Sequence, residues 1–193
     1  MIVERLAIPD VLLIKPPVYR DDRGHFLETW RASPYNTHGI GPFVQDNVSV
    51  SRRNVLRGLH FQYPGGQGKL VSALRGRVFD ACVDVRVGSP TFGKWVGAEL
   101  SSDNGFQLYI PPGFAHGFVT LSDEAVFAYK CTAYYAPETE RTVRWSDPAI
   151  AVAWPCDAPA CITLAPKDAA APTLVEIPTE LLPVYHQRHL PHG

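Results

Sequence analysis

Residues 77–87 constrain the fold more than any other part of the chain, because polar and apolar side chains share one face of this segment while the opposite face is wholly apolar. The mixed face carries Val78, Asp80, Cys82, Asp84 and Arg86, and the other consists of Phe79, Ala81, Val83, Val85 and Val87. Successive side chains of a β-strand point to opposite faces, so a period of two predicts a strand. We expect its apolar face to lie in a core.

The rest of the chain follows the same pattern of short strands separated by turns. The sequence holds 18 prolines and 15 glycines and shows hardly any helical periodicity, which indicates a β-sandwich or barrel. Short helical segments are expected to open at Ser33-Pro34 and at Pro178. We predict strands at residues 11–15, 25–30, 43–51, 56–62, 77–87, 95–100, 106–110, 117–121, 125–135 and 142–145.

Length and composition favour one folded domain. A chain of 193 residues can build one well-formed core, and two compact domains would be crowded. We predict a single domain over residues 1–193, with a core at about residues 20–175 and a C-terminal extension at 176–193. The net charge of -1 provides no broad field for nucleic acid or an anionic membrane. The N-terminus lacks the long apolar run of a signal peptide, so a cytoplasmic protein is expected.

A dense group of polar residues stands within the apolar segment 56–62. Arg57 brings a guanidinium that can bind phosphate through two hydrogen bonds, His60 brings an imidazole that titrates near neutral pH, and Lys69 follows after a short loop. Arg57 and His60 would face opposite ways in a regular strand, but Gly58 allows a bend that turns both to one side. The group indicates a site. The alternative is an edge strand with a solvated arginine and a packed histidine.

Residues 111–118 form a second dense group, which fits the Pro-x-Gly-x-x-His pattern of the cupin jelly roll through Pro111, Gly113 and His116. A cupin metal site also needs a His-x-His pair in the earlier strand. This chain has His60 followed by Gln62, and an amide is a poor substitute for neutral imidazole on a transition metal. We therefore predict an all-β, cupin-like jelly roll that binds no metal.

Proton transfer requires a base, a partner that orients the base, and an acid. The carboxylates that could orient a histidine are Asp80, Asp84 and Asp168, each of which could equally be a turn or surface residue. Tyr129 could act as an acid, although tyrosines in strands are more often core or rim residues.

The order and length of several motifs resemble the dTDP-4-dehydrorhamnose 3,5-epimerase family over residues 20–174. The matching blocks are Asp22-Arg23-Gly24-x-Phe26-x-Glu28, Gln45-Asp46-Asn47-x-Ser49, residues 56–62, Lys69-Leu70-Val71, residues 89–93, residues 111–118, Tyr129-Lys130 and Lys167-Asp168. Ala165 is a departure, since the family often has serine there.

The resemblance implies an isomerase that needs no cofactor and acts on a dTDP-4-keto-6-deoxyhexose. His60 would be the base, with Asp168 as its partner, and Tyr129 would return a proton on the opposite face. Lys69 would stabilise the developing oxyanion, and His116, oriented by Asp80, would assist. The product expected from dTDP-4-dehydro-6-deoxy-D-glucose is dTDP-4-dehydro-L-rhamnose, an intermediate of L-rhamnose synthesis.

The resemblance also implies a nucleotide-binding set and a homodimer in which the N-terminal region of one subunit completes the site of the other. Tyr135 would stack on the base, and Arg23 and Arg57 would contact the diphosphate or the base. Solvated surface charge is the alternative for Glu28 and Glu140. The other polar or apolar contacts implied for the substrate are Phe26, Glu28, Gln45, Asp46, Asn47, Lys69, His116 and Glu140.

Three other functions fit parts of this pattern. A relative that inverts only C3 or only C5 would carry nearly the same His, Asp, Lys and Tyr residues. A sugar-nucleotide-binding cupin without catalysis would need no acid and base, so the joint presence of His60, Asp168, Lys69 and Tyr129 argues against it. A metal-dependent cupin oxygenase is disfavoured by Gln62.

Overall fold

Antiparallel pairing of the strands gives two large sheets in the computed structural model, which describes residues 1–156 and 159–186. The six-stranded sheet has the order β1 (Ile2–Arg5), β2 (Leu12–Lys15), β10 (Gln107–Ile110), β7 (Lys69–Arg75), β12 (Glu124–Cys131) and β5 (Gln45–Arg52). The five-stranded sheet has the order β13 (Glu140–Thr142), β6 (Leu56–Gln62), β11 (Phe114–Thr120), β8 (Arg77–Asp84) and β9 (Trp95–Ser101). Neighbours within each sheet are mostly distant in sequence, as expected for a jelly roll.

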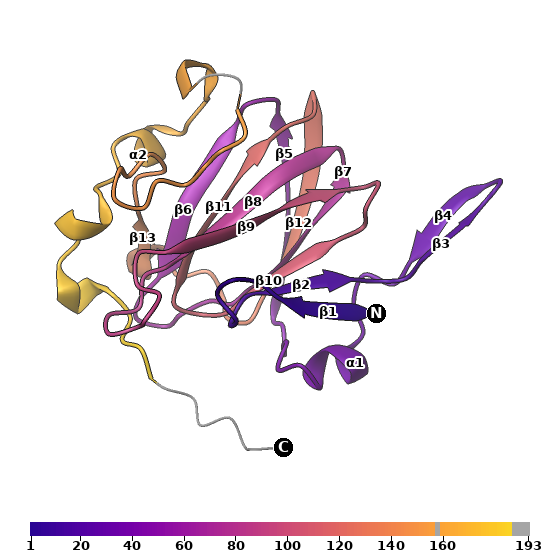
Figure 1. Ribbon diagram of the computed structural model, residues 1–193, viewed down its shortest axis with the longest axis horizontal. Coiled ribbons are helices and arrows are strands. Elements are labelled where there is room, and N and C mark those ends of the chain that lie inside the picture. The colour runs from indigo at the N-terminus through magenta and orange to yellow at the C-terminus, as the bar shows by residue number, and fades with distance from the viewer. Residues whose placement is uncertain (157–158, 187–193) are drawn as a thin grey trace.

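The remaining elements are short and flank the sheets. The hairpin of β3 (Val18–Asp21) and β4 (Gly24–Leu27) projects from the body of the molecule (Figure 1). The α-helices are α1 (Ala32–Asn36) and α2 (Pro166–Ala169), and the 3-10 turns are η1 (Pro137–Thr139), η2 (Pro159–Cys161), η3 (Leu174–Glu176) and η4 (Thr179–Leu181). No helix in the described part of the chain is long and apolar enough to cross a membrane. The predicted all-β jelly roll with short flanking helices is confirmed.

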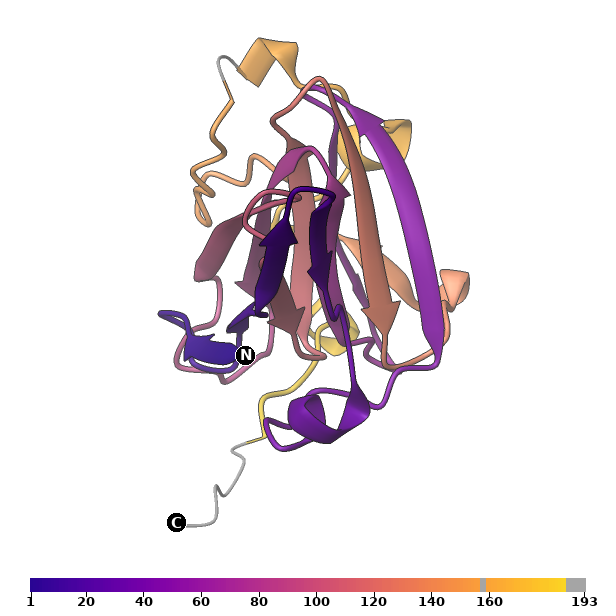
Figure 2. The same ribbon diagram turned by 90° about the vertical axis from the view of Figure 1, so that its right-hand side faces the viewer.

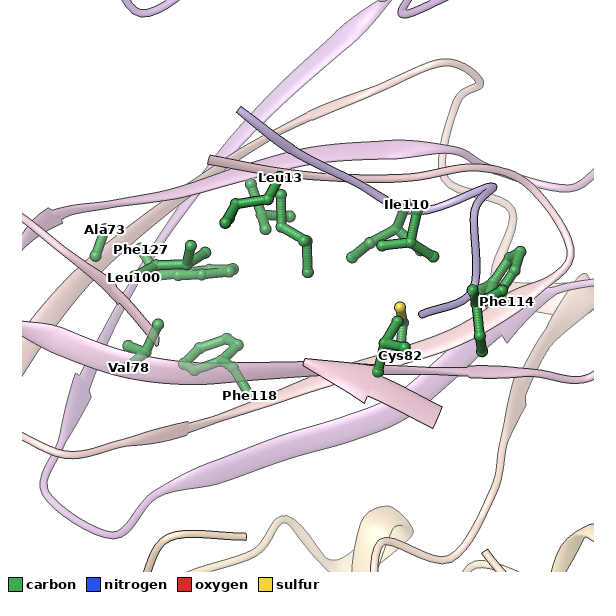
Figure 3. Close-up of a cluster of buried hydrophobic side chains, with 14 of the residues drawn as sticks. Leu13, Ala73, Val78, Cys82, Leu100, Ile110, Phe114, Phe118 and Phe127 are labelled. Carbon is green, nitrogen blue, oxygen red and sulfur yellow. The ribbon is translucent and has the colours of Figure 1, made fainter. Parts of the chain in front are cut away.

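Three hydrophobic clusters hold the layers together. The largest lies between the two sheets and includes Phe127 and Leu108 from one sheet and Phe118 and Leu100 from the other (Figure 3). A second cluster packs the outer face of the five-stranded sheet against the C-terminal segment through residues such as Leu182. The third joins β2 and β7 to α1, which lies at the lower end of the molecule in both views (Figures 1 and 2). Of the predicted C-terminal extension, residues 187–193 lie outside the described part.

Both faces of β8 are buried, the mixed face as well as the apolar one. Val83 packs into the cluster under the C-terminal segment, as predicted for the apolar face. Val78 and Cys82 pack into the cluster between the sheets, and Asp80 and Asp84 are completely buried. A buried carboxylate requires hydrogen-bonding partners, which the sequence pattern alone does not identify.

Several strand boundaries also differ from the predictions. Strand β12 ends at Cys131, four residues before the end of the predicted strand, and β13 overlaps the predicted strand at 142–145 only at Thr142. Strand β1 was not predicted, because Glu4 and Arg5 break the apolar alternation; as an edge strand, β1 leaves most of its side chains exposed.

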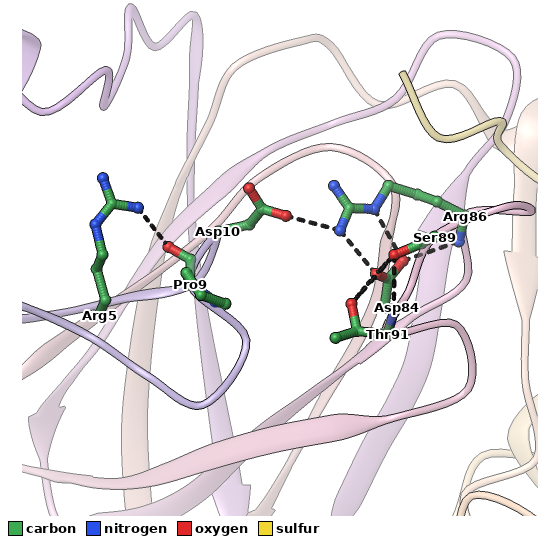
Figure 4. A network of polar contacts seen from close by, with 7 residues as sticks. All are labelled: Arg5, Pro9, Asp10, Asp84, Arg86, Ser89 and Thr91. Atoms are coloured by element: carbon green, nitrogen blue, oxygen red, sulfur yellow. Dashed lines mark hydrogen bonds and ion pairs between the residues drawn. The ribbon is translucent and has the colours of Figure 1, made fainter. Parts of the chain in front are cut away.

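Asp84 anchors a polar network that ties the N-terminal loop to β8 (Figure 4). Through Arg86 the network also contacts the C-terminal segment. Its carboxylate accepts hydrogen bonds from Arg86 Nε at 2.8 Å and from Thr91 Oγ1 at 2.6 Å. The Arg86 guanidinium also binds Asp10 and lies 4.9 Å from the ring centroid of Tyr185. Burial alone would raise the pKa of Asp84, but the hydrogen bonds from Arg86, Ser89 and Thr91 outweigh it and lower the pKa.

We expect Asp84→Ala to lower the free energy of unfolding by about 3 kcal/mol or more, because Arg86 would lose its buried partner. Chemical denaturation measures the change. As the control, Asp123→Ala removes a fully solvated partner of Arg53 and should cost about 1 kcal/mol or less. The pKa of Asp84 is lower in the folded protein than in the unfolded chain. The stabilisation that ionised Asp84 provides is therefore fully present at a pH above its unfolded pKa, and it is lost as the pH falls through its folded pKa. Equal costs for the two variants would contradict this account.

Candidate active site

A cavity of about 550 Å³ opens between the two sheets, at the end where polar side chains replace the apolar core. Its walls come from β5, β6, β7, β11 and β12 and from residues 163–168. This volume is in the range of a small-molecule site. The predicted site residues that line the cavity are Gln45, Asn47, Arg57, His60, Lys69, His116, Tyr129, Tyr135, Glu140 and Asp168.

Gly58 brings Arg57 and His60 to the same cavity, as predicted. His116 pairs with His60 and Phe118 pairs with Arg57, so β6 contains one more residue than β11 in this stretch. The extra residue forms a β-bulge, which shifts the alternation of inward and outward side chains by one residue. The side chains of Arg57 and His60 therefore point to the same side of the sheet. Gly58 has φ 134°, and a Cβ there would lie 2.5 Å from the Cα of Gly117. Only glycine fits this close approach of two strands.

His60 and Asp168 form a hydrogen-bonded pair at the cavity wall. The distance from His60 Nε2 to Asp168 Oδ1 is 2.6 Å, and the carboxylate also accepts the Gly58 N–H at 3.4 Å. Burial acts to raise the pKa of Asp168, but the hydrogen bond and charge of His60 outweigh it and the pKa is lowered. An ionised Asp168 holds the proton on Nε2 and leaves Nδ1 of His60 as a basic atom.

His116 and Asp80 form a second pair of a different electrostatic character. His116 Nε2 lies 2.8 Å from Asp80 Oδ2, and both side chains are buried. Burial raises the pKa of Asp80 and lowers that of His116, although each partner opposes the shift of the other. Burial therefore favours neutral forms in this pair, whereas the His60 pair supports an ionised carboxylate.

Lys69 and Tyr129 supply the remaining groups with exchangeable protons. Burial lowers the pKa of the Lys69 ammonium, against the opposing charges of Cys131, Asp80 and Glu140, and makes it a stronger acid. Burial raises the pKa of Tyr129, so its phenol keeps its proton at neutral pH. The cavity wall thus brings together an imidazole with an ionised partner, a buried amine and a phenol that keeps its proton at neutral pH.

Four predicted site residues do not line the cavity: Arg23, Phe26, Glu28 and Asp46. Arg23 and Phe26 lie on the projecting hairpin, and Glu28 follows it. Asp46 points away from the cavity and pairs with Lys130 at 2.9 Å. Within this chain, therefore, these residues are separate from the cluster around His60.

Lys167 and Gln62 also line the cavity, although neither is among the predicted site residues. Lys167 Nζ lies 2.7 Å from Glu140 Oε2, and this ion pair joins α2 to β13 at the rim. Lys167 directly precedes Asp168 in the sequence, and this neighbourhood alone could have identified Lys167 as a site residue. Gln62 lies two residues after His60 on β6, and the side-chain period of a strand therefore places both on the same wall of the cavity.

That the protein binds no metal ion stays a prediction. Among the described residues, no three His, Cys, Asp or Glu side chains converge on a position where they could hold a metal ion. His60 and His116 are paired across neighbouring strands, but each directs its Nε2 to a carboxylate.

Ala165 precedes α2, the short helix that carries Asp168, and makes no side-chain cap. We expect Ala165→Ser to raise the free energy of unfolding by about 0.5–1 kcal/mol, since a hydroxyl there can accept a free backbone N–H of the helix. Turnover should change little, because His60 and Gly58 already hold the carboxylate. Thermal melting measures the effect, with Ala169→Ser at the end of the helix as control. An equal gain in both variants would contradict the capping explanation.

The jelly roll and the arrangement of His60, Asp168, Lys69 and Tyr129 define a cupin-type protein with an acid–base site. A family model described as dTDP-4-dehydrorhamnose 3,5-epimerase matches residues 5–176. The chain belongs to this family of sugar-nucleotide epimerases, which are isomerases.

Individual relatives agree with the family match. The chain is 53% identical to dTDP-4-dehydrorhamnose 3,5-epimerase of Salmonella typhimurium over 90% of this chain and 96% of the relative. It is 54% identical over 86% of its length to the enzyme of that name in Neisseria gonorrhoeae, but spans only 51% of that relative.

Two solved structures are informative. The dTDP-6-deoxy-D-glucose-3,5-epimerase RmlC of Legionella pneumophila, in complex with dTDP-4-keto-L-rhamnose, superposes with a TM-score of 0.92 at 50% identity, covering 96% of this chain and 98% of that one. ChmJ of Streptomyces bikiniensis, a 3'-monoepimerase in complex with dTDP-quinovose, gives a TM-score of 0.86 at 36% identity, covering 93% and 92%.

Proposed function

We propose that this chain, acting as a single domain, converts dTDP-4-dehydro-6-deoxy-D-glucose into dTDP-4-dehydro-L-rhamnose by inverting C3 and C5 without a cofactor. One observation carries the proposal: the 2.6 Å contact between His60 and Asp168 lies in a cavity that Lys69 and Tyr129 also line. The names of the Salmonella and Legionella relatives, each at about half identity over most of both chains, support the same substrate.

Proton removal is the first step in our proposal. The hydrogens at C3 and C5 are acidic because each lies next to the C4 ketone, and loss of either gives an enolate. His60 would take this proton on Nδ1, since Nε2 is engaged by Asp168. The ionised Asp168 would then stabilise the imidazolium that forms.

The enolate carries its negative charge on the C4 oxygen, and Lys69 would stabilise that charge with a preorganised ammonium. His116, fixed by Asp80, would serve as a neutral hydrogen-bonding group beside it. Tyr129 would return a proton to the opposite face of the carbon, which inverts the centre. His60 then loses its proton to water and Tyr129 regains one, so each round leaves a solvent hydrogen on the inverted carbon.

The rest of the cavity would hold the nucleotide. Arg57 would bind the diphosphate, and Gln45, Asn47 and Glu140 would provide polar contacts to the base and sugar. Tyr135, whose side chain is 51% exposed at the rim, would stack on the thymine ring.

Deuterium incorporation tests this function directly. The enzyme is incubated with dTDP-4-dehydro-6-deoxy-D-glucose in heavy water, and NMR locates the label. Deuterium at both C3 and C5, with formation of the L-configured product, is the expected result. Label at one carbon would instead indicate a single-centre epimerase, the activity named for the Streptomyces bikiniensis neighbour. No label would overturn the proposal.

We further propose that the protein acts as a homodimer in which the β3–β4 hairpin reaches the cavity of the other subunit. The hairpin projects from the body, and its residues Phe26 and Tyr19 are 68% and 63% exposed. The outer face of the six-stranded sheet exposes Val48, Val50 and Leu74, with exposed fractions of 63%, 55% and 51%. Apolar side chains gathered on one exposed face are typical of an interaction surface, which supports a subunit contact there.

A complementation experiment tests this arrangement. Arg23→Glu and His60→Ala should each inactivate the enzyme alone. When the two variants are co-expressed, about a quarter of wild-type activity should return, because about half of the dimers are mixed and each mixed dimer has one intact site. If the hairpin served its own subunit, no mixed dimer would have an intact site and activity would stay absent.

A further inference from the structure

The loop that carries Tyr135, residues 132–136, is held from three sides by glutamine side chains. Gln67 Nε2 donates to the Ala133 carbonyl at 2.7 Å, and Gln45 Oε1 accepts the Tyr135 N–H at 2.8 Å. The third is Gln62, on β6 next to the catalytic cluster. The three glutamines lie on β5, on β6 and between β6 and β7, all far from the loop in sequence.

Gln62 binds the backbone on both sides of Tyr135. Its Nε2 donates to the Tyr134 carbonyl at 3.3 Å, and its Oε1 accepts the Ala136 N–H at 3.1 Å. Nε2 also lies 3.4 Å from the Gly65 carbonyl. The Gln62 residue is only 6% exposed, so these bonds form away from bulk water.

This arrangement requires an amide. A primary amide offers a donor and an acceptor on one planar group, whereas leucine offers neither and ionised glutamate only accepts. Tyr135 itself is half exposed, so the position of its ring depends largely on how firmly its backbone is held. A stacking residue that is fixed before the ligand arrives loses less conformational entropy on binding.

We propose that Gln62 is a positioning residue for nucleotide recognition: it fixes the backbone on either side of Tyr135 so that the ring stands ready to stack on the base. The inference rests on the proposed stacking role of Tyr135. It also gives a function to the position at which a metal-binding cupin would have its second histidine, because here an amide holds a binding loop.

Calorimetric titration with dTDP tests the inference. Gln62→Leu should raise the Kd for dTDP about tenfold, the loss expected when a base stack is weakened. The kcat at saturating substrate should fall by less than about twofold, because His60 and Tyr129 remain in place. Ser122→Ala is the matched control: its hydroxyl also bridges two backbone groups, the Arg77 N–H and the Glu124 carbonyl, but in a turn outside the cavity lining. The control should bind dTDP as the wild type does.

A double-mutant cycle separates positioning from a general loss of structure. Tyr135→Ala alone should weaken dTDP binding, and in that background Gln62→Leu should change the Kd by less than about twofold. If Tyr135→Ala binds dTDP normally, the proposed stacking role fails. If Tyr135→Ala binds weakly but Gln62→Leu binds normally, or if the two losses simply add, only the positioning inference is overturned.

Gln62→Glu provides the same test if the leucine variant does not fold. It keeps the acceptor for the Ala136 N–H and regains a donor only when its carboxyl is protonated. Its Kd for dTDP, relative to wild type at the same pH, should therefore decrease as the pH is lowered from about 8 to about 5. A ratio that does not change with pH would overturn the inference.

Discussion

His60→Ala is expected to abolish hydrogen exchange at both C3 and C5 and to reduce kcat by about 10³-fold or more, the range for loss of a general base. The methyl group of alanine cannot accept a proton, and Asp168 would be left without the imidazole that it orients. The Kd for dTDP should stay within about threefold of wild type, because the proposed nucleotide contacts come from other residues. Deuterium NMR measures exchange, and calorimetry measures binding.

The control is His38→Ala, which removes an exposed imidazole outside the cavity lining and should leave exchange unchanged. Exchange at either carbon at the native rate in His60→Ala would identify a different base. Loss of dTDP binding together with exchange would show instead that His60 supports the whole cavity.

Tyr129→Phe should separate proton removal from inversion. His60 can still take the proton and return a solvent deuteron to the same face, so label should enter the substrate. Inversion requires delivery from the opposite face, and we expect it to fall by about 10²-fold or more. The neutral phenol is available at neutral pH because burial raises the pKa of Tyr129. The measured quantity is the ratio of deuterium exchange to product formation.

Tyr185→Phe is the matched control for this variant, since its ring packs on Arg86 and lies outside the cavity lining. It should leave the ratio of exchange to inversion at the wild-type value. If Tyr129→Phe formed product at the native rate, the acid would be another group. A loss of exchange equal to the loss of inversion would place Tyr129 in proton removal as well.

Strand periodicity and the spacing of motifs predicted much of the fold. The alternation over residues 43–51 correctly separates Gln45, Asn47 and Ser49, which line the cavity, from Val48 and Val50, which face outward. The same alternation could have excluded Asp46 from this cavity, because Asp46 lies between two inward-facing residues of one strand. The bulge at Gly58 was also predictable, since only a change of alternation turns Arg57 and His60 to one side.

The positions of the N-terminal residues follow a different rule. Arg23 and Phe26 lie on a hairpin that projects from the body of the molecule, and no local pattern in the sequence reveals the direction in which a hairpin projects. The sequence could identify these residues as candidates, but their separation from the cavity of this chain is evident only in the fold.

Side-chain period and residue type predicted most of the strands, the cavity-facing side of β5 and the kinds of chemical group available, but not β1 or β7. The residue pattern alone left open which carboxylate serves which histidine; the family resemblance implied the pairs Asp168–His60 and Asp80–His116, and the tertiary structure brings both pairs into contact. Three aspartates were candidates for His60, and the fold gives Asp168 to His60, Asp80 to His116 and Asp84 to Arg86. Asp168 is 108 residues from His60, and such pairs form through strand pairing and chain return, which place distant segments together independently of their spacing in sequence.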